Sequence, residues 1–298
     1  MPLVILREVA ESIHFNSCPH YLSIRIHKMI IFYFSGTGNS KYIAELFSRK
    51  MDEKCHSIEE SVDFAELINQ EDIVCFCYPI YGSRVPRLMR DFVIKNMDTL
   101  KDKKIIIFCT QLIFSGDGAR VLTDLFPQNQ ATGVIYAEHF FMPNNVCNLF
   151  FLPLAGKKLT ERYLSKAQKK MQKVCENINK GVIKKRGFNP VSRVLGLAQG
   201  SFMPGIEERA KSKVRIDGDC NQCGICVSLC PMNNFTRKNI NEIKNEAKSE
   251  TKNEGNTKNN ISTNNNCIMC YRCINKCPQK AIRVFVKAKV KKQFLLWA

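Results

Sequence analysis

Two copies of one cysteine pattern near the C-terminus constrain this chain more than any other feature. The first copy reads CNQCGICVSLCP from Cys220, the second reads CIMCYRCINKCP from Cys267, and both have the spacing C-x2-C-x2-C-x3-C-P. Thiolates at this spacing suit iron–sulfur clusters, because three cysteines in a tight turn can cap one face of a four-iron cubane. Zinc sites also use CxxC motifs, but usually as two pairs without a third cysteine and a Cys-Pro. The pattern therefore predicts two [4Fe–4S] clusters.

The fourth cysteine of each copy begins a segment that leads away from the other three, so the two copies are expected to exchange their fourth ligands. The predicted ligands are Cys220, Cys223, Cys226 and Cys277 for the first cluster, and Cys230, Cys267, Cys270 and Cys273 for the second cluster. The region from about 213 to 286 resembles a bacterial-type two-cluster ferredoxin. It departs from that family in a long stretch rich in Asn, Lys and Glu between the copies.

That stretch has too little apolar surface to offset the entropy cost of ordering it, so we expect a disordered insertion near 236–266. Because the insertion lies between the two copies, the predicted ligand sets are unaffected by it.

The first half of the chain alternates unbroken apolar segments with segments of helical periodicity. Strands are expected at 29–34, 54–58, 72–80, 103–111 and 133–140, and helices at 40–50, 85–97 and 117–126. Strands without polar alternation are typical of a parallel sheet that is covered on both faces. We therefore expect a doubly wound α/β domain with about five strands, followed by a small α+β domain that holds the clusters.

The loop FSGTGNS, residues 34–40, joins the first expected strand to the first expected helix. It lacks the lysine of a P-loop and the GxGxxG of a dinucleotide loop, which disfavours a triphosphate and a dinucleotide. Hydroxyls and backbone N–H groups at a helix N-terminus suit a single phosphate monoester, such as that of FMN. The loop resembles the phosphate loop of flavodoxins, and the resemblance covers about 29–140. The candidate ligands are Ser35, Gly36, Thr37, Gly38, Asn39 and Ser40.

Two further loops fall where a flavodoxin contacts its isoalloxazine ring, at the carboxyl ends of later strands. The first contributes Pro79, Tyr81 and Gly82, with Tyr81 as the candidate stacking aromatic. The second contributes Thr110, Gln111, Gly116 and Gly118, and its glycines would permit close backbone approach. The alternative is that Tyr81 is a partly buried surface aromatic and that the glycines serve ordinary turns.

The expected domain organisation has five parts. These are an extension at 1–28 that is disordered or precedes a true start at Met29, a flavodoxin-like domain at 29–150, a basic helical connector at 151–210, a two-cluster ferredoxin domain at 211–287 and a basic tail at 288–298. Within the connector, 159–185 predicts one long basic helix with an apolar side. The tail is expected to pack on the protein, since one Trp and a few aliphatic residues make a weak membrane anchor.

The net charge of +18 belongs mainly to the second half of the chain, because the region of the first expected domain is slightly acidic. It indicates either a solvated helix face and tail or an acidic docking partner. Scattered cysteines in apolar segments favour a reducing compartment, and no apolar run reaches the length of a transmembrane helix. We therefore expect a cytoplasmic protein without a transmembrane segment.

A flavodoxin-like domain followed by a two-cluster ferredoxin resembles a family of flavodoxin–ferredoxin fusion proteins of anaerobes. The resemblance implies electron transfer between redox protein partners, with two [4Fe–4S] clusters and FMN as cofactors. One alternative is a flavin-dependent oxidoreductase that acts on a small substrate, and a third reading is an iron–sulfur redox sensor. The five histidines form no metal or triad pattern, no motif supports nucleic-acid binding, and no catalytic residue is assigned.

Overall fold

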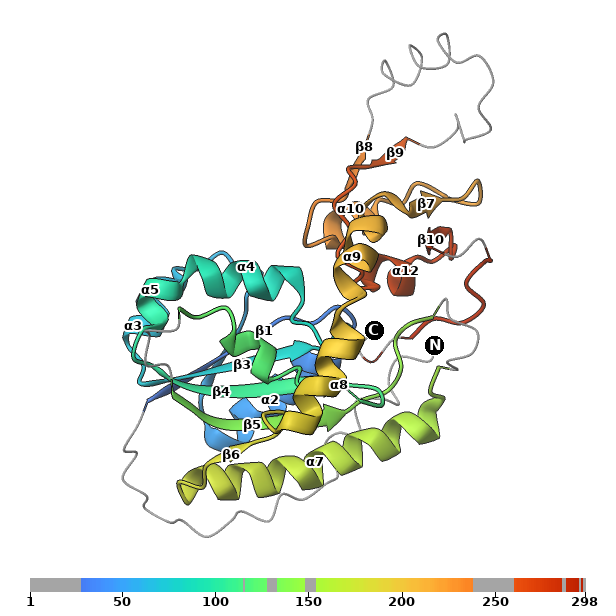
Figure 1. Cartoon of the computed structure of the whole chain (residues 1–298). Helices are drawn as coiled ribbons and strands as arrows, with labels where there is room; N and C mark the ends of the chain where they lie inside the picture. Colours follow the sequence, from blue (N-terminus) through green and yellow to red (C-terminus); the bar gives the residue numbers. More distant parts are fainter. Residues whose placement is uncertain are drawn as a thin grey trace.

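A six-stranded parallel sheet organises the first part of the chain (Figure 1). Its strands are β1 (Met29–Tyr33), β2 (Lys54–Ser57), β3 (Ile73–Pro79), β4 (Lys104–Gln111), β5 (Gly133–Phe141) and β6 (Lys184–Lys185), in the spatial order β2-β1-β3-β4-β5-β6. The first five strands have the order of the flavodoxin-like doubly wound fold, whose ligands bind where the winding direction reverses, between β1 and β3. The predicted fold class of this part is confirmed.

The structure is a computed structural model, which describes residues 28–114, 116–127, 133–147, 154–237, 260–285, 288–294 and 296. The expected N-terminal extension lies outside the described residues except for Lys28, whose backbone carbonyl accepts hydrogen bonds from Asp72 and Ile73. Among the described helices, none is long and apolar enough to cross a membrane.

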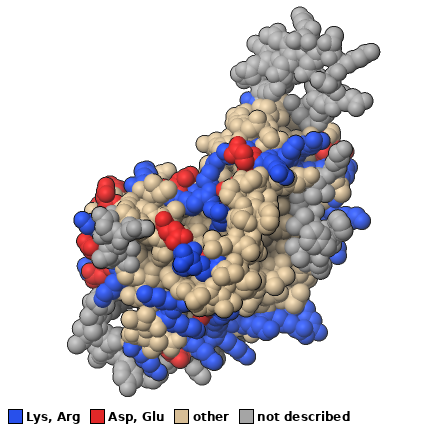
Figure 2. Space-filling view, in the orientation of Figure 1, with Lys and Arg blue, Asp and Glu red and all other residues tan. Residues whose placement is uncertain are grey.

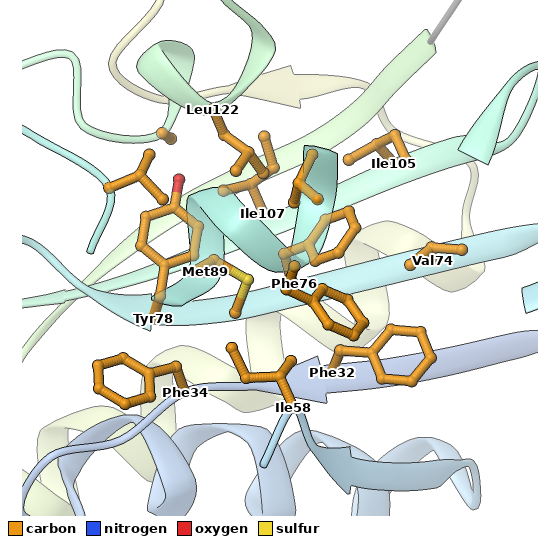
Figure 3. Close-up of a cluster of buried hydrophobic side chains, with 14 of the residues drawn as sticks. Phe32, Phe34, Ile58, Val74, Phe76, Tyr78, Met89, Ile105, Ile107 and Leu122 are labelled. Carbon is orange, nitrogen blue, oxygen red and sulfur yellow. The ribbon is translucent and has the colours of Figure 1, made fainter. Parts of the chain in front are cut away.

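Helices cover both faces of the sheet, which explains why its strands are apolar without interruption. One face carries α3 (Phe64–Asn69), α4 (Arg87–Lys95), α5 (Met97–Leu100) and α6 (Arg120–Thr123). Figure 3 shows part of this core, in which Phe32 and Phe76 of the sheet lie near Met89 of α4. The other face carries α2 (Asn39–Met51) and α7 (Lys157–Asn179).

The long basic helix α7 is shorter than predicted and packs on the sheet. Its apolar side is buried or half-buried against the core of the second face, through Leu164, Ala167, Met171, Val174 and Ile178. The helix ends at Asn179, and Gly181 follows with a left-handed φ of 69°, which favours glycine. The chain then turns back, and Lys184 and Lys185 add a sixth strand beside β5 where the sequence predicted continued helix.

One further expectation about an element needs correction. The helix predicted at 117–126 is reduced to the single turn of α6, which is flanked by turns. Residues 189–212, which lie mostly within the predicted helical connector, form α8 (Pro190–Gly200) and α9 (Met203–Ser212). The α8 helix has a clear start, because the Asn189 side chain accepts a hydrogen bond from the Ser192 backbone and Pro190 occupies the first helical position.

The C-terminal part is a small domain of short elements arranged as two similar halves. These elements are β7 (Val214–Ile216), α10 (Ile225–Leu229), β8 (Phe235–Arg237), β9 (Ile261–Thr263), α12 (Arg272–Lys276) and β10 (Ile282–Val284). Strand β7 pairs antiparallel with β10, and β8 pairs antiparallel with β9. The fold class predicted for this part, a small α+β domain, agrees with these elements.

The β8–β9 pair occupies both ends of the segment predicted to be disordered. Phe235 and Ile261 are 2% and 5% exposed and join the core of the small domain, so burial of these two side chains stabilises the pairing. The bounds 236–266 were therefore too wide. The middle of that segment, 238–259, lies outside the described residues.

The C-terminal tail packs across both parts of the protein. Val290 is buried in the core of the small domain, and Leu296 packs against the α2 and α7 side of the sheet. The Gln293 side chain donates hydrogen bonds to the carbonyls of Ile274 and Cys277, and the Phe294 backbone donates to Asn275. The described residues of the tail are thus held by the fold.

Candidate functional site

The phosphate-loop residues predicted from the sequence lie together at the carboxyl end of β1, ahead of α2. Gly38 has a φ of 102° and precedes the first residue of α2, and no side chain caps this helix end. The Ser35 hydroxyl accepts a hydrogen bond from the Gly38 backbone at 3.1 Å, and the Ser40 hydroxyl lies 2.7 Å from that of Thr110 on β4. The loop therefore presents an uncapped helix N-terminus, as an anion site requires.

A cavity of about 420 Å³ opens beside this loop at the carboxyl edge of the sheet. This volume is within the range of small-molecule sites. Ten of the thirteen predicted cofactor-binding residues line it: Ser35, Gly36, Thr37, Asn39, Ser40, Pro79, Tyr81, Gly82, Thr110 and Gln111. The structure thus brings the predicted phosphate loop and the first residues of both predicted ring loops to one space.

The other three predicted residues do not line this cavity. Gly38 lines a neighbouring hollow of about 300 Å³ together with Lys41 and Arg272. Gly116 lies against Gly196 of α8, so the close approach that it permits is to another helix. The Gly118 carbonyl accepts a hydrogen bond from the buried Tyr78 hydroxyl.

The polar groups of the cavity fit a ligand that has a phosphate and a polar ring edge. Asn39 Oδ1 and Gln111 Oε1 are buried and have no hydrogen-bond partner among the described residues. Buried polar atoms without partners are costly, so a polar ligand in this cavity would stabilise both. Both atoms are hydrogen-bond acceptors, so they need a donor such as a ring N–H or a hydroxyl of a flavin, while backbone N–H groups at the uncapped start of α2 can donate to its phosphate.

The predicted ligands of the second cluster line one small, apolar cavity. Cys267, Cys270 and Cys273 reach it from the start of α12 and the loop before it, and Cys230 reaches it from the end of α10. Burial raises the pKa of the Cys270 thiol to about 12, so a metal that binds this sulfur as the thiolate would have to displace its proton. The donor set therefore fits a buried metal–sulfur centre with one ligand exchanged between the halves.

The predicted ligands of the first cluster are less enclosed. Cys226 lies close enough to Cys220 and Cys277 for electrostatic interaction with both sulfurs, which agrees with the grouping expected for exchanged ligands. Cys223 is exposed. Among the described residues, no three His, Cys, Asp or Glu side chains are arranged as for a bound metal ion, and no cysteine forms a disulfide.

The two halves of the small domain repeat the same backbone geometry around their cysteines. A backbone N–H two residues after Cys220 donates to its sulfur at 3.4 Å, and the same bond forms at Cys267. The backbone N–H groups of Asn234 and Ala281, each four residues after a cysteine, donate to the sulfurs of Cys230 and Cys277 at 3.2 and 3.3 Å. Backbone N–H groups directed at sulfur stabilise thiolates and tune the reduction potential of a cluster.

Several residues that connect the cavity to the cluster domain were not predicted. The 420 Å³ cavity, called the flavin-sized cavity below, is also lined by four residues outside the sheet domain. These are Met269 and Tyr271 of the second cysteine motif, Gln199 of α8 and Met203 of α9. The Asn145 side chain donates a 2.6 Å hydrogen bond to the Thr37 hydroxyl. Of these residues, only Tyr271 could have been noticed in the sequence, because this large aromatic residue occupies the position that Gly224 has in the first cysteine motif.

Arg272 joins the phosphate loop to the second cysteine motif. Its guanidinium donates to the carbonyls of Ser35 and Gly36 at 2.8 and 3.3 Å and to the carboxylate of Glu59. Burial alone would lower the pKa of Arg272, but hydrogen bonds and the charge of Glu59 raise it above its ordinary value. The guanidinium is therefore a permanently charged bridge between the two parts.

Comparisons with known proteins agree with a division of the chain into a sheet domain and a cysteine-rich domain. A model of the flavodoxin domain family matches residues 30–182, and a model of the 4Fe-4S dicluster domain matches residues 219–282. No curated protein matches the chain.

Solved flavodoxins align with the first part of the chain. Oxidised flavodoxin 2 from Bacillus cereus is 19% identical, with 50% of this chain and 99% of that chain covered and a TM-score of 0.35. Two-electron reduced Megasphaera elsdenii flavodoxin is also 19% identical, with 48% and 98% covered and a TM-score of 0.33. Identities and TM-scores this low carry no argument about the function of this chain. On its family match and sheet order, the chain belongs to the flavodoxin domain family and carries a 4Fe-4S dicluster ferredoxin domain after its flavodoxin domain.

Proposed function

We propose that this protein transfers low-potential electrons between redox partners, using one FMN and two [4Fe–4S] clusters within a single chain. A flavin exchanges one or two electrons, and the clusters pass single electrons, so the combination can couple one-electron and two-electron partners. Ser35, Thr37, Asn39 and Ser40 would bind the FMN phosphate, while Thr110, Gln111 and Tyr81 would orient the ring. The eight motif cysteines would hold the clusters in the two exchanged sets.

The observation that carries this proposal is the direct contact between the two cofactor regions. A Cβ atom added at Gly36 of the phosphate loop would lie only 2.1 Å from the carbonyl oxygen of Cys270, a predicted ligand of the second cluster. Such contact lets electrons pass inside the protein without a second docking event.

The test is anaerobic purification followed by iron, sulfide and flavin analysis. We expect about eight irons and about eight sulfides per chain, from two four-iron clusters, together with one FMN that is released on denaturation. Colourless protein that holds zinc would contradict the cluster assignment, and protein with full iron but no flavin after incubation with FMN would contradict the flavin assignment.

A second candidate function is a flavin-dependent oxidoreductase that reduces a small substrate. It is favoured by the extension of the cavity toward Ile113 and Phe114, whose side chains are 67% and 48% exposed and could contact an apolar molecule. Turnover of a small quinone or other organic acceptor by the reduced protein, without an added protein partner, would support this function. The redox-sensor reading has no comparable structural feature in its favour.

The charge distribution supports an acidic redox partner. Figure 2 shows Lys and Arg side chains gathered along one edge of the molecule, over α7, whose exposed face includes Lys157, Lys158, Lys166, Lys169 and Lys173. A positive face steers acidic partners and gives association rates that fall with salt. The free thiols of buried cysteines support a reducing compartment such as the cytoplasm of an anaerobe.

A further inference from the structure

Two side chains separate the second cysteine set from the flavin-sized cavity. Met269 and Tyr271 line the small cavity that holds Cys230, Cys267, Cys270 and Cys273, and the same two side chains line the 420 Å³ cavity. The two sites therefore share one wall, which is a single layer of side chains thick. We define this wall as the second-cluster loop, residues 268–272.

The flavodoxin domain packs closely against the second-cluster loop. Tyr81, the predicted ring-stacking aromatic, packs with Met269, Tyr271 and Met203 in one apolar cluster. Ile268 and Cys270 extend into the core that covers one face of the sheet. The loop is thus as much a part of the flavodoxin domain as of the cluster domain.

The equivalent loop of the first half has different side chains and a different environment. Met269 and Tyr271 have φ values of 56° and 59°, and the residues at the matching positions, Gln222 and Gly224, have φ values of 59° and 80°. A bulky residue in this left-handed region is uncommon and strained, and such strain gathers at functional sites. The first half has an exposed cysteine, Cys223, where the second has the buried Cys270. The two clusters are therefore not equivalent in their surroundings.

We propose that the second-cluster loop forms one wall of the flavin site, so that the second cluster exchanges electrons with the flavin and the first cluster serves the external partner. This inference rests on the proposed function. Each internal transfer oxidises the second cluster by one electron and reduces the flavin by one electron, or the reverse, and no bond between heavy atoms forms or breaks. In this arrangement Met269 and Tyr271, despite their left-handed backbone, fill the space between the two cofactors.

Glycine variants at matched positions of the two halves test this inference. Met269→Gly and Tyr271→Gly remove wall side chains, whereas Gln222→Gly makes the same kind of change at the equivalent position of the first half. In all three variants glycine replaces a residue with a left-handed φ and removes the backbone strain at that position, so each variant should fold and retain its iron. We expect FMN to bind about tenfold or more weakly to the two wall variants and within about twofold of wild type in Gln222→Gly. The dissociation constant is measured by fluorescence titration of FMN into flavin-free protein.

A spectroscopic measurement separates the two clusters. Binding of FMN should change the electron paramagnetic resonance spectrum of reduced protein when only the second cluster is retained, as in Cys223→Ser, and should leave it unchanged when only the first is retained, as in Cys273→Ser. Equal FMN affinity in all three glycine variants would overturn the shared wall while leaving FMN binding by the protein intact. Wild-type protein that holds its iron but binds no FMN would instead overturn the flavin part of the proposed function, and this inference with it.

Discussion

The guanidinium of Arg272 in the cluster domain forms two hydrogen bonds, of 2.7 and 2.6 Å, with the carboxylate of Glu59 in the flavodoxin domain. The two side chains are only 18% and 23% exposed. Because Arg272 also binds the carbonyls of Ser35 and Gly36, this ion pair fixes the phosphate loop against the second cysteine motif. One arginine thus joins the predicted sites of both kinds of cofactor.

The first prediction concerns this ion pair. Glu59→Gln leaves a partly buried guanidinium with a neutral partner, and it should lower the free energy of unfolding by about 2 kcal/mol, as expected for hydrogen bonds to charged groups. Glu208→Gln is the matched control, because Glu208 is 73% exposed in its pair with Lys211 and should contribute less than about 1 kcal/mol. Denaturant midpoints followed through cluster absorbance give the comparison. Equal midpoints for the two variants would contradict the role assigned to the pair.

The second prediction tests the exchange of ligands between the halves. Cys277→Ser should remove the same cluster as Cys226→Ser, although Cys277 belongs to the second motif, because Cys226 and Cys277 lie together. Each variant should retain about four irons, and the two should give the same residual spectrum in the reduced state. Cys55→Ser, which changes a half-buried cysteine on β2, should retain full iron. A Cys277→Ser spectrum that matches Cys273→Ser instead would refute the exchange.

The third prediction concerns pH. Burial, reinforced by the charge of Arg186, lowers the pKa of His139 from 6.5 to about 4. Since the unfolded chain takes up a proton on this histidine below about 6.5 and the folded chain does not, the stabilisation is present above that pH and is lost as the pH falls toward 4. The full loss is on the order of 3 kcal/mol.

His139→Gln should therefore reduce the difference between denaturation midpoints measured at pH 7.5 and pH 5.5. The comparison within one variant cancels any constant effect of the substitution on packing. An unchanged difference would mean that another group causes the acid sensitivity.

The strands and the 4Fe-4S dicluster domain were predictable because their signals are local. Unbroken apolar runs, such as those around Ile30, Val74 and Ile106, are buried in a sheet that is covered on both faces, and the spacing of the cysteines alone marks the dicluster domain. The strand at Lys184 had no such signal, because a pair of lysines shows no periodicity and is placed only by pairing with β5. Ile261 was a missed signal, since an isolated apolar residue in an Asn-rich stretch marks where the chain returns to the core.

The contact between the domains could not be predicted from local pattern. Arg272 and Gly36 are 236 residues apart in the chain, and neither has a neighbour that marks it as an interface residue. Gly36 was interpreted as part of a phosphate loop, and the structure adds a second reason for glycine at this position, which is the carbonyl of Cys270. The wall between the cofactor sites depends on how two domains meet, which no single motif contains.

The last prediction tests that contact. Gly36→Ala places a methyl group 2.1 Å from the Cys270 carbonyl oxygen, and because both groups are backbone, neither can move away at low cost. We expect a loss of about 1–3 kcal/mol in unfolding free energy, as for overpacked cores, together with weaker FMN binding, because the phosphate loop must shift. Gly205→Ala is the control, since Gly205 lies in α9 with open space around it, and alanine there should be neutral or stabilising by up to about 1 kcal/mol. If Gly36→Ala matched Gly205→Ala in both stability and FMN affinity, the two domains would not meet in solution as they do in this structure.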